Sequence, residues 1–300
     1  MISRYRHGSR TKQHLEGSPG FAGLIAALLC CPALVAFAAD APSPPGPEVR
    51  SASAYTQDAA TGEVIFERQA ADVVPIASIT KLMTALVVLE SAQPLDERIQ
   101  ITEDDRWTGK GAFSRLDVGA KITRADLLRL ALMASENRAA HTLARSYEGG
   151  TAAFIRAMNA RAKALGMKQT RFHDSSGLSN LNVSSARDLG KLVAAASREP
   201  VIREYSTLTS LDVKMGKHLF TYRNTNLLIG KPDWDIRVQK TGYTSAAGQC
   251  LVMEAMLEER PVIMVFLNSF GTLTRTADAR RVRKWMAAQE EIKTQPVTAR

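Results

Sequence analysis

A run of apolar residues that begins just after Ser78 is the strongest constraint on how this chain folds. Between Ser78 and Glu90 apolar side chains fall on almost every face of a helix, so this helix has no side suited to water. Such a helix must lie at the centre of a folded unit, with Ser78 at its N-terminal end. The apolar positions are Leu82, Met83, Ala85, Leu86, Val87, Val88 and Leu89.

Strand-like segments lie near both ends of the chain, and helical segments lie between them. Residues 53–58 and 63–67 flank a short turn and predict a hairpin. A closing helix is predicted over 275–290. We therefore expect an α+β fold, in which one antiparallel sheet is built from both chain ends around an inserted helical region. The remaining predicted strands are 236–241, 248–257 and 261–268, and the remaining predicted helices include 137–147, 151–165 and 186–196.

The first 38 residues have the pattern of an export signal. Basic residues precede an apolar run that ends in Ala36-Phe37-Ala38, which is a typical signal-peptidase site. We expect 1–38 to be a cleaved signal peptide and 39–50 to be a Pro-rich tether. A single catalytic domain at 51–290 and a flexible tail at 291–300 complete the predicted organisation.

Composition excludes several classes of function. Cleavage of the leader leaves Cys250 as the only cysteine, so the exported protein has no internal disulfide. The net charge is +9, but the basic residues are dispersed and no aromatic-interleaved patch occurs, which argues against nucleic-acid binding. The histidines lack ligand spacing, so we expect no metal and no cofactor.

Ser78 and Lys81 are the first candidate catalytic pair. Three residues apart on a helix, their side chains share one face and can touch. A serine hydroxyl becomes a good nucleophile only when a base removes its proton. Lys81 can be that base if burial and a second cation, such as Lys240, lower its pKa toward neutrality. The alternative is a solvated pair, but this helix has almost no solvated face.

Ser135-Glu136-Asn137 stands between two predicted helices. One interpretation makes Ser135 the N-cap of the second helix, the commonest role for serine at such a position. In the catalytic interpretation the Ser135 hydroxyl transfers a proton to the leaving nitrogen, and Asn137 hydrogen-bonds the peptide carbonyl of the substrate. The two roles are compatible.

Lys240-Thr241-Gly242 ends a predicted strand. Gly242 allows a substrate backbone to approach, and the strand edge can pair with an extended peptide. Lys240 and Thr241 would contact a substrate carboxylate by charge and hydroxyl. The backbone N–H groups of Ser78 and Tyr243 would form an oxyanion hole. Arg275 is a weaker candidate for binding the same carboxylate.

These three motifs, in this order, resemble those of the low-molecular-mass penicillin-binding proteins, the serine DD-peptidases that act on peptidoglycan. Within that family the chain resembles the D-alanyl-D-alanine endopeptidases of the penicillin-binding protein 7 type. The resemblance extends from about residue 52 to 285. Further segments that carry it are Pro75-Ile76-Ala77, Leu132-Met133-Ala134, Ser184-Ser185-Ala186-Arg187-Asp188-Leu189 and Tyr222-Arg223-Asn224-Thr225-Asn226.

The resemblance implies a β-lactamase/DD-peptidase-like fold and acylation of Ser78 by a D-alanine-containing peptide, with β-lactams trapping the same serine. The short stretch after Gly242 leaves no room for the second β-rich domain and anchor helix of related carboxypeptidases. This favours a periplasmic endopeptidase without a stable membrane anchor. Carboxypeptidase activity and a non-catalytic wall-binding module remain the alternatives, and association with other wall enzymes is left open.

Overall fold

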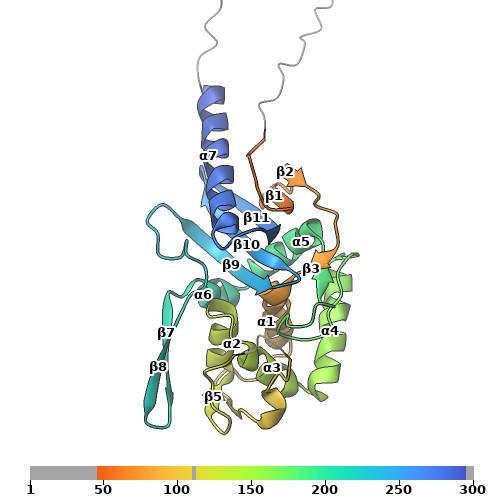
Figure 1. Ribbon diagram of the computed structural model, residues 1–300, viewed down its shortest axis with the longest axis vertical. Coiled ribbons are helices and arrows are strands. Elements are labelled where there is room, and N and C mark those ends of the chain that lie inside the picture. The colour runs from red at the N-terminus through yellow and green to blue at the C-terminus, as the bar shows by residue number, and fades with distance from the viewer. Residues whose placement is uncertain (1–45, 110–112, 295–300) are drawn as a thin grey trace, which may run out of the picture. The chain divides into compact units, whose positions relative to one another are not determined.

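Strands from the two ends of the described chain form the main sheet, which is antiparallel throughout (Figure 1). This computed structural model describes residues 46–109 and 113–294. The sheet has the order β2-β1-β11-β10-β9, so the first strand pairs directly with the last. The predicted α+β fold is thereby confirmed. The strands are β1 (Ser53–Asp58), β2 (Val64–Arg68), β9 (Asp235–Thr244), β10 (Gly248–Leu257) and β11 (Arg260–Ser269).

Both faces of the sheet are covered. Side chains alternate between faces along a strand, and neighbouring residues of β10 therefore belong to different cores. Val252 packs in the core shared with the inserted helices, whereas Leu251 and Met253 pack under the last helix, α7 (Thr274–Thr294). The near-continuous apolar sequence of β10 and β11 follows from this double burial.

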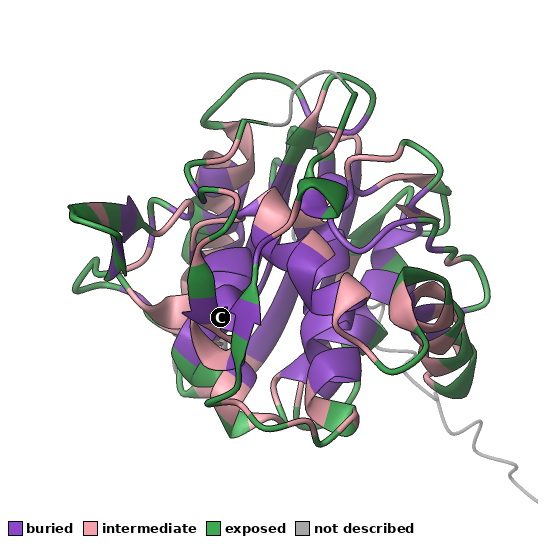
Figure 2. Cartoon of the chain, turned by 90° about the horizontal axis from the view of Figure 1, so that it is seen from below, coloured by how far each residue is buried: buried purple, intermediate pink, exposed green. Residues whose placement is uncertain are grey.

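Helix α1 (Thr80–Glu90) is the central helix, as predicted, and every residue from Thr80 to Val88 is buried. Figure 2 shows buried residues concentrated in the central helices and strands, with exposed residues in the outer loops. Ser78 does not lie in α1 itself. It lies in a one-turn 3₁₀ helix, η1 (Ala77–Ile79), that leads into α1.

The described part of the inserted region contains five further α-helices and several short strand pairs. Helices α2 and α3 meet at the Ser135 motif. The helices are α2 (Arg124–Met133), α3 (Asn137–Arg145), α4 (Gly150–Ala164), α5 (Ala186–Ala196) and α6 (Pro200–Thr207), with the 3₁₀ turn η2 (Glu103–Asp105). The pairs are β3 (Val74–Pro75) with β6 (Val183–Ser184), β4 (Arg98–Gln100) with β5 (Lys121–Thr123), and β7 (Ser210–Met215) with β8 (His218–Arg223).

Most of the boundaries that differ from the sequence prediction do so by one or two residues, and two larger differences concern the Lys240 motif and the tail. Lys240-Thr241-Gly242 does not end its strand, because β9 continues to Thr244 and pairs with β10 along this stretch. Helix α7 continues to Thr294, so the tail expected at 291–300 begins as helix. The predicted signal peptide and the tether up to residue 45 lie outside the described residues. Among the residues that are described, no helix is long and apolar enough to cross a membrane.

Candidate active site

Lys81 is held at the centre of the site by three hydrogen bonds. Its Nζ donates to Ser78 Oγ at 2.8 Å, to Asn137 Oδ1 at 2.7 Å and to the Ser176 carbonyl at 2.6 Å. The side chain is fully buried. The structure therefore brings together the first two predicted motifs and adds Ser176, which the sequence analysis did not identify.

The partners of Lys81 decide which way a proton can move. An ammonium has three N–H donors, and all three are used here. A neutral amine keeps two N–H groups and one lone pair. The Asn137 amide oxygen and the Ser176 carbonyl can only accept, so they take the two N–H groups. The lone pair then faces the Ser78 hydroxyl, which is the one partner able to donate.

Burial lowers the pKa of Lys81 to about 7, while the charges of Asp174 and Glu136 act in the opposite direction. The predicted cause was burial together with a second cation. Burial is the largest cause of the lowering, and Lys81 and Lys240 repel each other when both are charged. At neutral pH a substantial fraction of Lys81 is therefore the uncharged base that proton transfer from Ser78 needs.

Ser135 lies between α2 and α3 in a left-handed backbone conformation, with φ of 60°. The N-cap interpretation is wrong, because Glu136 is the N-cap of α3 and its side chain accepts from Arg138 N at 3.2 Å. An energetically costly backbone at a non-glycine residue is typical of functional sites. Asn137, the first residue of α3, bonds Lys81, so Ser135 lies two residues from a direct partner of the base.

Lys240 points into the same interior from β9. It is fully buried, and its Nζ donates to the Thr241 carbonyl at 2.9 Å. Burial holds its pKa well below the ordinary value, and the charges of Lys81 and Arg275 add to this effect. Within the described residues β9 pairs with no strand other than β10, so it is an edge strand of the sheet.

Gly242 has a structural role that the sequence analysis did not predict. A Cβ at this position would lie 3.0 Å from the Ile76 carbonyl oxygen and 3.1 Å from Ser78 N. The absence of a side chain therefore lets β9 pack against η1. This contact brings the backbone N–H of Ser78 beside the strand that carries the N–H of Tyr243, whose side chain is exposed.

Two further segments, which carry Thr225 and Arg275, support the site. Thr225 Oγ1 lies 2.6 Å from Thr241 Oγ1, and Thr225 N donates to the Met133 carbonyl, which ties β9 to the end of α2. Arg275 Nη1 donates to the Gly242 carbonyl at 2.7 Å and to the Cys250 carbonyl at 2.9 Å. The Arg275 guanidinium thus contacts backbone on β9 and β10.

Ser176 lies in a loop that is rich in Gly, Ser and Asn. Its sequence Asp174-Ser175-Ser176-Gly177 holds the signal that could have identified a built turn, since an Asp side chain readily binds backbone N–H groups two and three residues on. The Asp174 carboxylate accepts from Ser176 N and Gly177 N, both at 2.6 Å. Gly177, at φ of 87°, lies against the Ala77 carbonyl.

The family model described as D-alanyl-D-alanine carboxypeptidase matches residues 38–271. The chain belongs to this family of serine D-Ala-D-Ala peptidases. The predicted family resemblance is confirmed. Groups of three or more His, Cys, Asp or Glu side chains able to hold a metal are absent from the described part of the chain.

Relatives within this family are similar over most of the chain. A D-alanyl-D-alanine endopeptidase of Pseudomonas aeruginosa is 49% identical over 80% of this chain and 78% of its own length. One of Escherichia coli is 45% identical over 92% and 89%. The crystal structure of the Streptomyces K15 DD-transpeptidase has 27% identity and a TM-score of 0.76, and the match covers 81% of this chain and 99% of that protein.

Proposed function

We propose that this chain is a D-alanyl-D-alanine endopeptidase, which hydrolyses D-alanyl-meso-diaminopimelate cross-links of peptidoglycan through an acyl-Ser78 intermediate. The observation that carries the proposal is the Lys81–Ser78 contact of 2.8 Å, made by a lysine whose pKa lies near 7. A neutral lysine with its lone pair on the serine hydroxyl is the arrangement that nucleophilic attack requires.

In the proposed mechanism Lys81 takes the proton of Ser78 as Oγ attacks the carbonyl carbon of the D-alanine that is joined to diaminopimelate. The developing oxyanion is bound by the backbone N–H groups of Ser78 and Tyr243. Ser135 gives its proton to the leaving nitrogen and receives the proton held by Lys81, the C–N bond breaks, and an ester on Ser78 remains. Lys81, again neutral, takes a proton from water as the water oxygen attacks the ester carbon, and that proton passes to Ser78 Oγ as the acid leaves.

The substrate would lie as an extended strand along the free edge of β9. Asn137 would bind its peptide carbonyl, while Lys240 and Thr241 would contact a carboxylate of the substrate. A β-lactam resembles this acyl donor and should trap Ser78 as a stable ester. One relative supports this part of the proposal: penicillin-binding protein D2 of Listeria monocytogenes, 30% identical with a TM-score of 0.70, was solved with cefotaxime bound.

The relatives favour cleavage of cross-links over trimming of terminal D-alanine. Relatives named endopeptidase are 40–49% identical to this chain, and relatives named carboxypeptidase are 28–30% identical. Because the substrate is the cell wall, we also propose that the leader at 1–38 is cleaved and that the mature enzyme acts in the periplasm, where other wall enzymes could associate with it.

A purified cross-linked muropeptide dimer, analysed by mass spectrometry after incubation with the enzyme, tests the proposal. We expect conversion to monomers without release of free D-alanine. Free D-alanine with an intact dimer would instead identify a carboxypeptidase. Ser78→Ala is the control, and it should abolish both cleavage and covalent β-lactam labelling. Wild-type protein that binds wall fragments without cleavage or labelling would identify a binding module.

A further inference from the structure

The base Lys81 depends on a turn that the three sequence motifs do not include. Its shortest hydrogen bond, at 2.6 Å, goes to the Ser176 carbonyl. The preceding carbonyl, of Ser175, accepts from Thr84 Oγ1, also at 2.6 Å. Both contacts join the loop after α4 to successive turns of α1. The position of the Lys81 amine relative to Ser78 therefore depends on what fixes residues 174–177.

The Asp174 carboxylate is what fixes them. Its Oδ1 accepts from Ser176 N at 2.6 Å, Ser176 Oγ at 2.8 Å and Gly177 N at 2.6 Å, and its Oδ2 accepts from Ser179 N at 2.8 Å. Four donors on one buried carboxylate determine the orientation of the peptide unit that presents its carbonyl to Lys81. The negative charge of Asp174 also acts directly on Lys81 and opposes the effect of burial.

We propose that Asp174 is a positioning residue for the general base, which orients Lys81 through the Ser176 carbonyl and stabilises its protonated form by charge. This inference rests on the proposed acylation of Ser78 and adds a residue outside the three motifs. Asp174 contacts neither Ser78 nor the substrate edge of β9 in this arrangement. Asp174 acts on Lys81 through the geometry of the 174–177 turn and through its negative charge.

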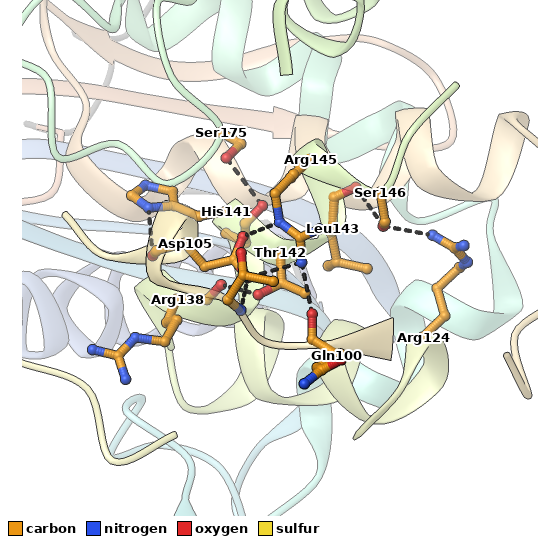
Figure 3. Close-up of polar contacts among 12 residues, drawn as sticks. Gln100, Asp105, Arg124, Arg138, His141, Thr142, Leu143, Arg145, Ser146 and Ser175 are labelled. Atoms are coloured by element: carbon orange, nitrogen blue, oxygen red, sulfur yellow. Dashed lines mark hydrogen bonds and ion pairs between the residues drawn. The ribbon is translucent and has the colours of Figure 1, made fainter. Parts of the chain in front are cut away.

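Other charged groups face the same cluster and define what a pH profile would report. Glu136 acts on Lys81 from the start of α3, and Lys240 faces it from β9. Behind the turn, His141 Nε2 lies 3.0 Å from Ser176 Oγ and its Nδ1 lies 3.3 Å from the Asp105 carbonyl. Figure 3 shows His141 and Arg145 converging on Asp105.

His141 competes with Asp174 for one proton. The Ser176 hydroxyl has a single hydrogen, and it can point to Asp174 Oδ1 or to an unprotonated His141 Nε2. Burial lowers the pKa of His141, although the charge of Asp174 opposes this. A hollow of about 260 Å³, lined in part by Trp107, His141, His173 and Asp174, lies beside this cluster. The backbone donors to Asp174 are unaffected by this competition.

The test is the pH profile of Ser78 acylation by a fluorescent penicillin in Asp174→Asn. Loss of the charge should move the acid limb to lower pH by about one unit, because a nearby carboxylate raises a lysine pKa by that order. Loss of the turn geometry should lower the alkaline plateau about tenfold or more. The proposal would be overturned by an acylation rate that falls equally at every pH with the acid limb unmoved. An unchanged pH profile would also overturn it.

Two further variants separate charge, geometry and stability. Asp188→Asn is the matched control: Asp188 is also a buried carboxylate with several hydrogen bonds, but it is not among the charges that act on Lys81. It should leave the acid limb unmoved. Asp174→Glu keeps the charge and displaces it, so its plateau should fall while its acid limb stays; a wild-type plateau there would contradict the positioning role. The variants are compared only after the wild-type protein has been shown to label at Ser78. A failure of the proposed function is thereby detected separately from a failure of the inference about Asp174.

Discussion

Lys81 sets the pH dependence of acylation at the scale of a single residue. Its pKa is lowered to about 7 by burial, so below that pH the ammonium carries a proton where the lone pair is needed. Above it the neutral amine can take the proton of Ser78. We expect the second-order rate of β-lactam acylation to rise about tenfold per pH unit below neutrality and to level off above it. Stopped-flow labelling measures this, and a rate independent of pH would remove Lys81 as the base.

Ser135 and Thr123 allow a catalytic serine to be distinguished from a capping residue. Ser135 is not a cap, so Ser135→Ala should leave the free energy of unfolding nearly unchanged while lowering turnover by about 100-fold, the contribution typical of positioned proton transfer. Thr123 is a true N-cap, accepting from Asp126 N at 3.1 Å. Thr123→Ala should cost about 1 kcal/mol of stability without changing the acylation rate.

Chemical denaturation and labelling of these two variants give the comparison. A stability loss in Ser135→Ala equal to that of Thr123→Ala, with full activity, would restore the capping interpretation.

At the scale of an element, the contact between the 174–177 turn and η1 positions the nucleophile. A Cβ on Gly177 would lie 1.9 Å from the Ala77 carbonyl oxygen, whereas a Cβ on Gly166 would meet no atom. Both glycines have positive φ, 87° and 69°. Gly166→Ala should therefore cost about 1 kcal/mol from backbone strain alone.

Gly177→Ala adds to this strain a steric clash with the Ala77 carbonyl. We expect the free energy of unfolding to fall by about 3 kcal/mol and labelling at Ser78 to be lost. Thermal melts and labelling of both variants check this. Equal effects of the two substitutions would show that η1 adapts to the added methyl group.

The sequence predicted an element well where clear turn residues bound it. Strand β1, helix α5 and strand β10 have the predicted boundaries, because turn residues stand at the ends of each segment. The β7–β8 hairpin was missed, although Leu211, Val213 and Met215 alternate before Gly216. Its strands extend from the main body and are largely exposed, so the apolar signal is weak (Figure 1).

The sequence motifs predicted the principal side chains of the candidate site. They did not predict the tertiary contacts that support those side chains. Ser78 and Lys81 share a helical repeat, so their contact follows from local geometry. The contact from Lys81 to Ser176 joins residues far apart in the chain, and no local pattern encodes it. The left-handed backbone of Ser135 and the packing of Gly242 on η1 likewise depend on tertiary contacts.

At the scale of the whole molecule, the sheet is completed by both chain ends, and Asp278 of α7 joins them. Its Oδ2 accepts from Ser51 N at 2.8 Å and Ser51 Oγ at 2.5 Å, and its Oδ1 accepts from Arg50 N at 3.0 Å. Asp278 is fully buried on the face of the sheet opposite the inserted helices.

Asp278→Asn should therefore lower the free energy of unfolding by about 2 kcal/mol, since hydrogen bonds to a buried charge are among the stronger ones. The acylation rate per folded molecule should stay at the wild-type value, because the hydrogen bonds of Asp278 go to Arg50 and Ser51 and not to the Ser78–Lys81 site. The matched control is Asp233→Asn, which removes an exposed pair with Arg283 at 2.9 Å and should cost less than about 1 kcal/mol. Denaturant titration with parallel labelling measures both quantities. Equal stability of the two variants would show that the chain ends are held by the strand pairing of β1 with β11 alone.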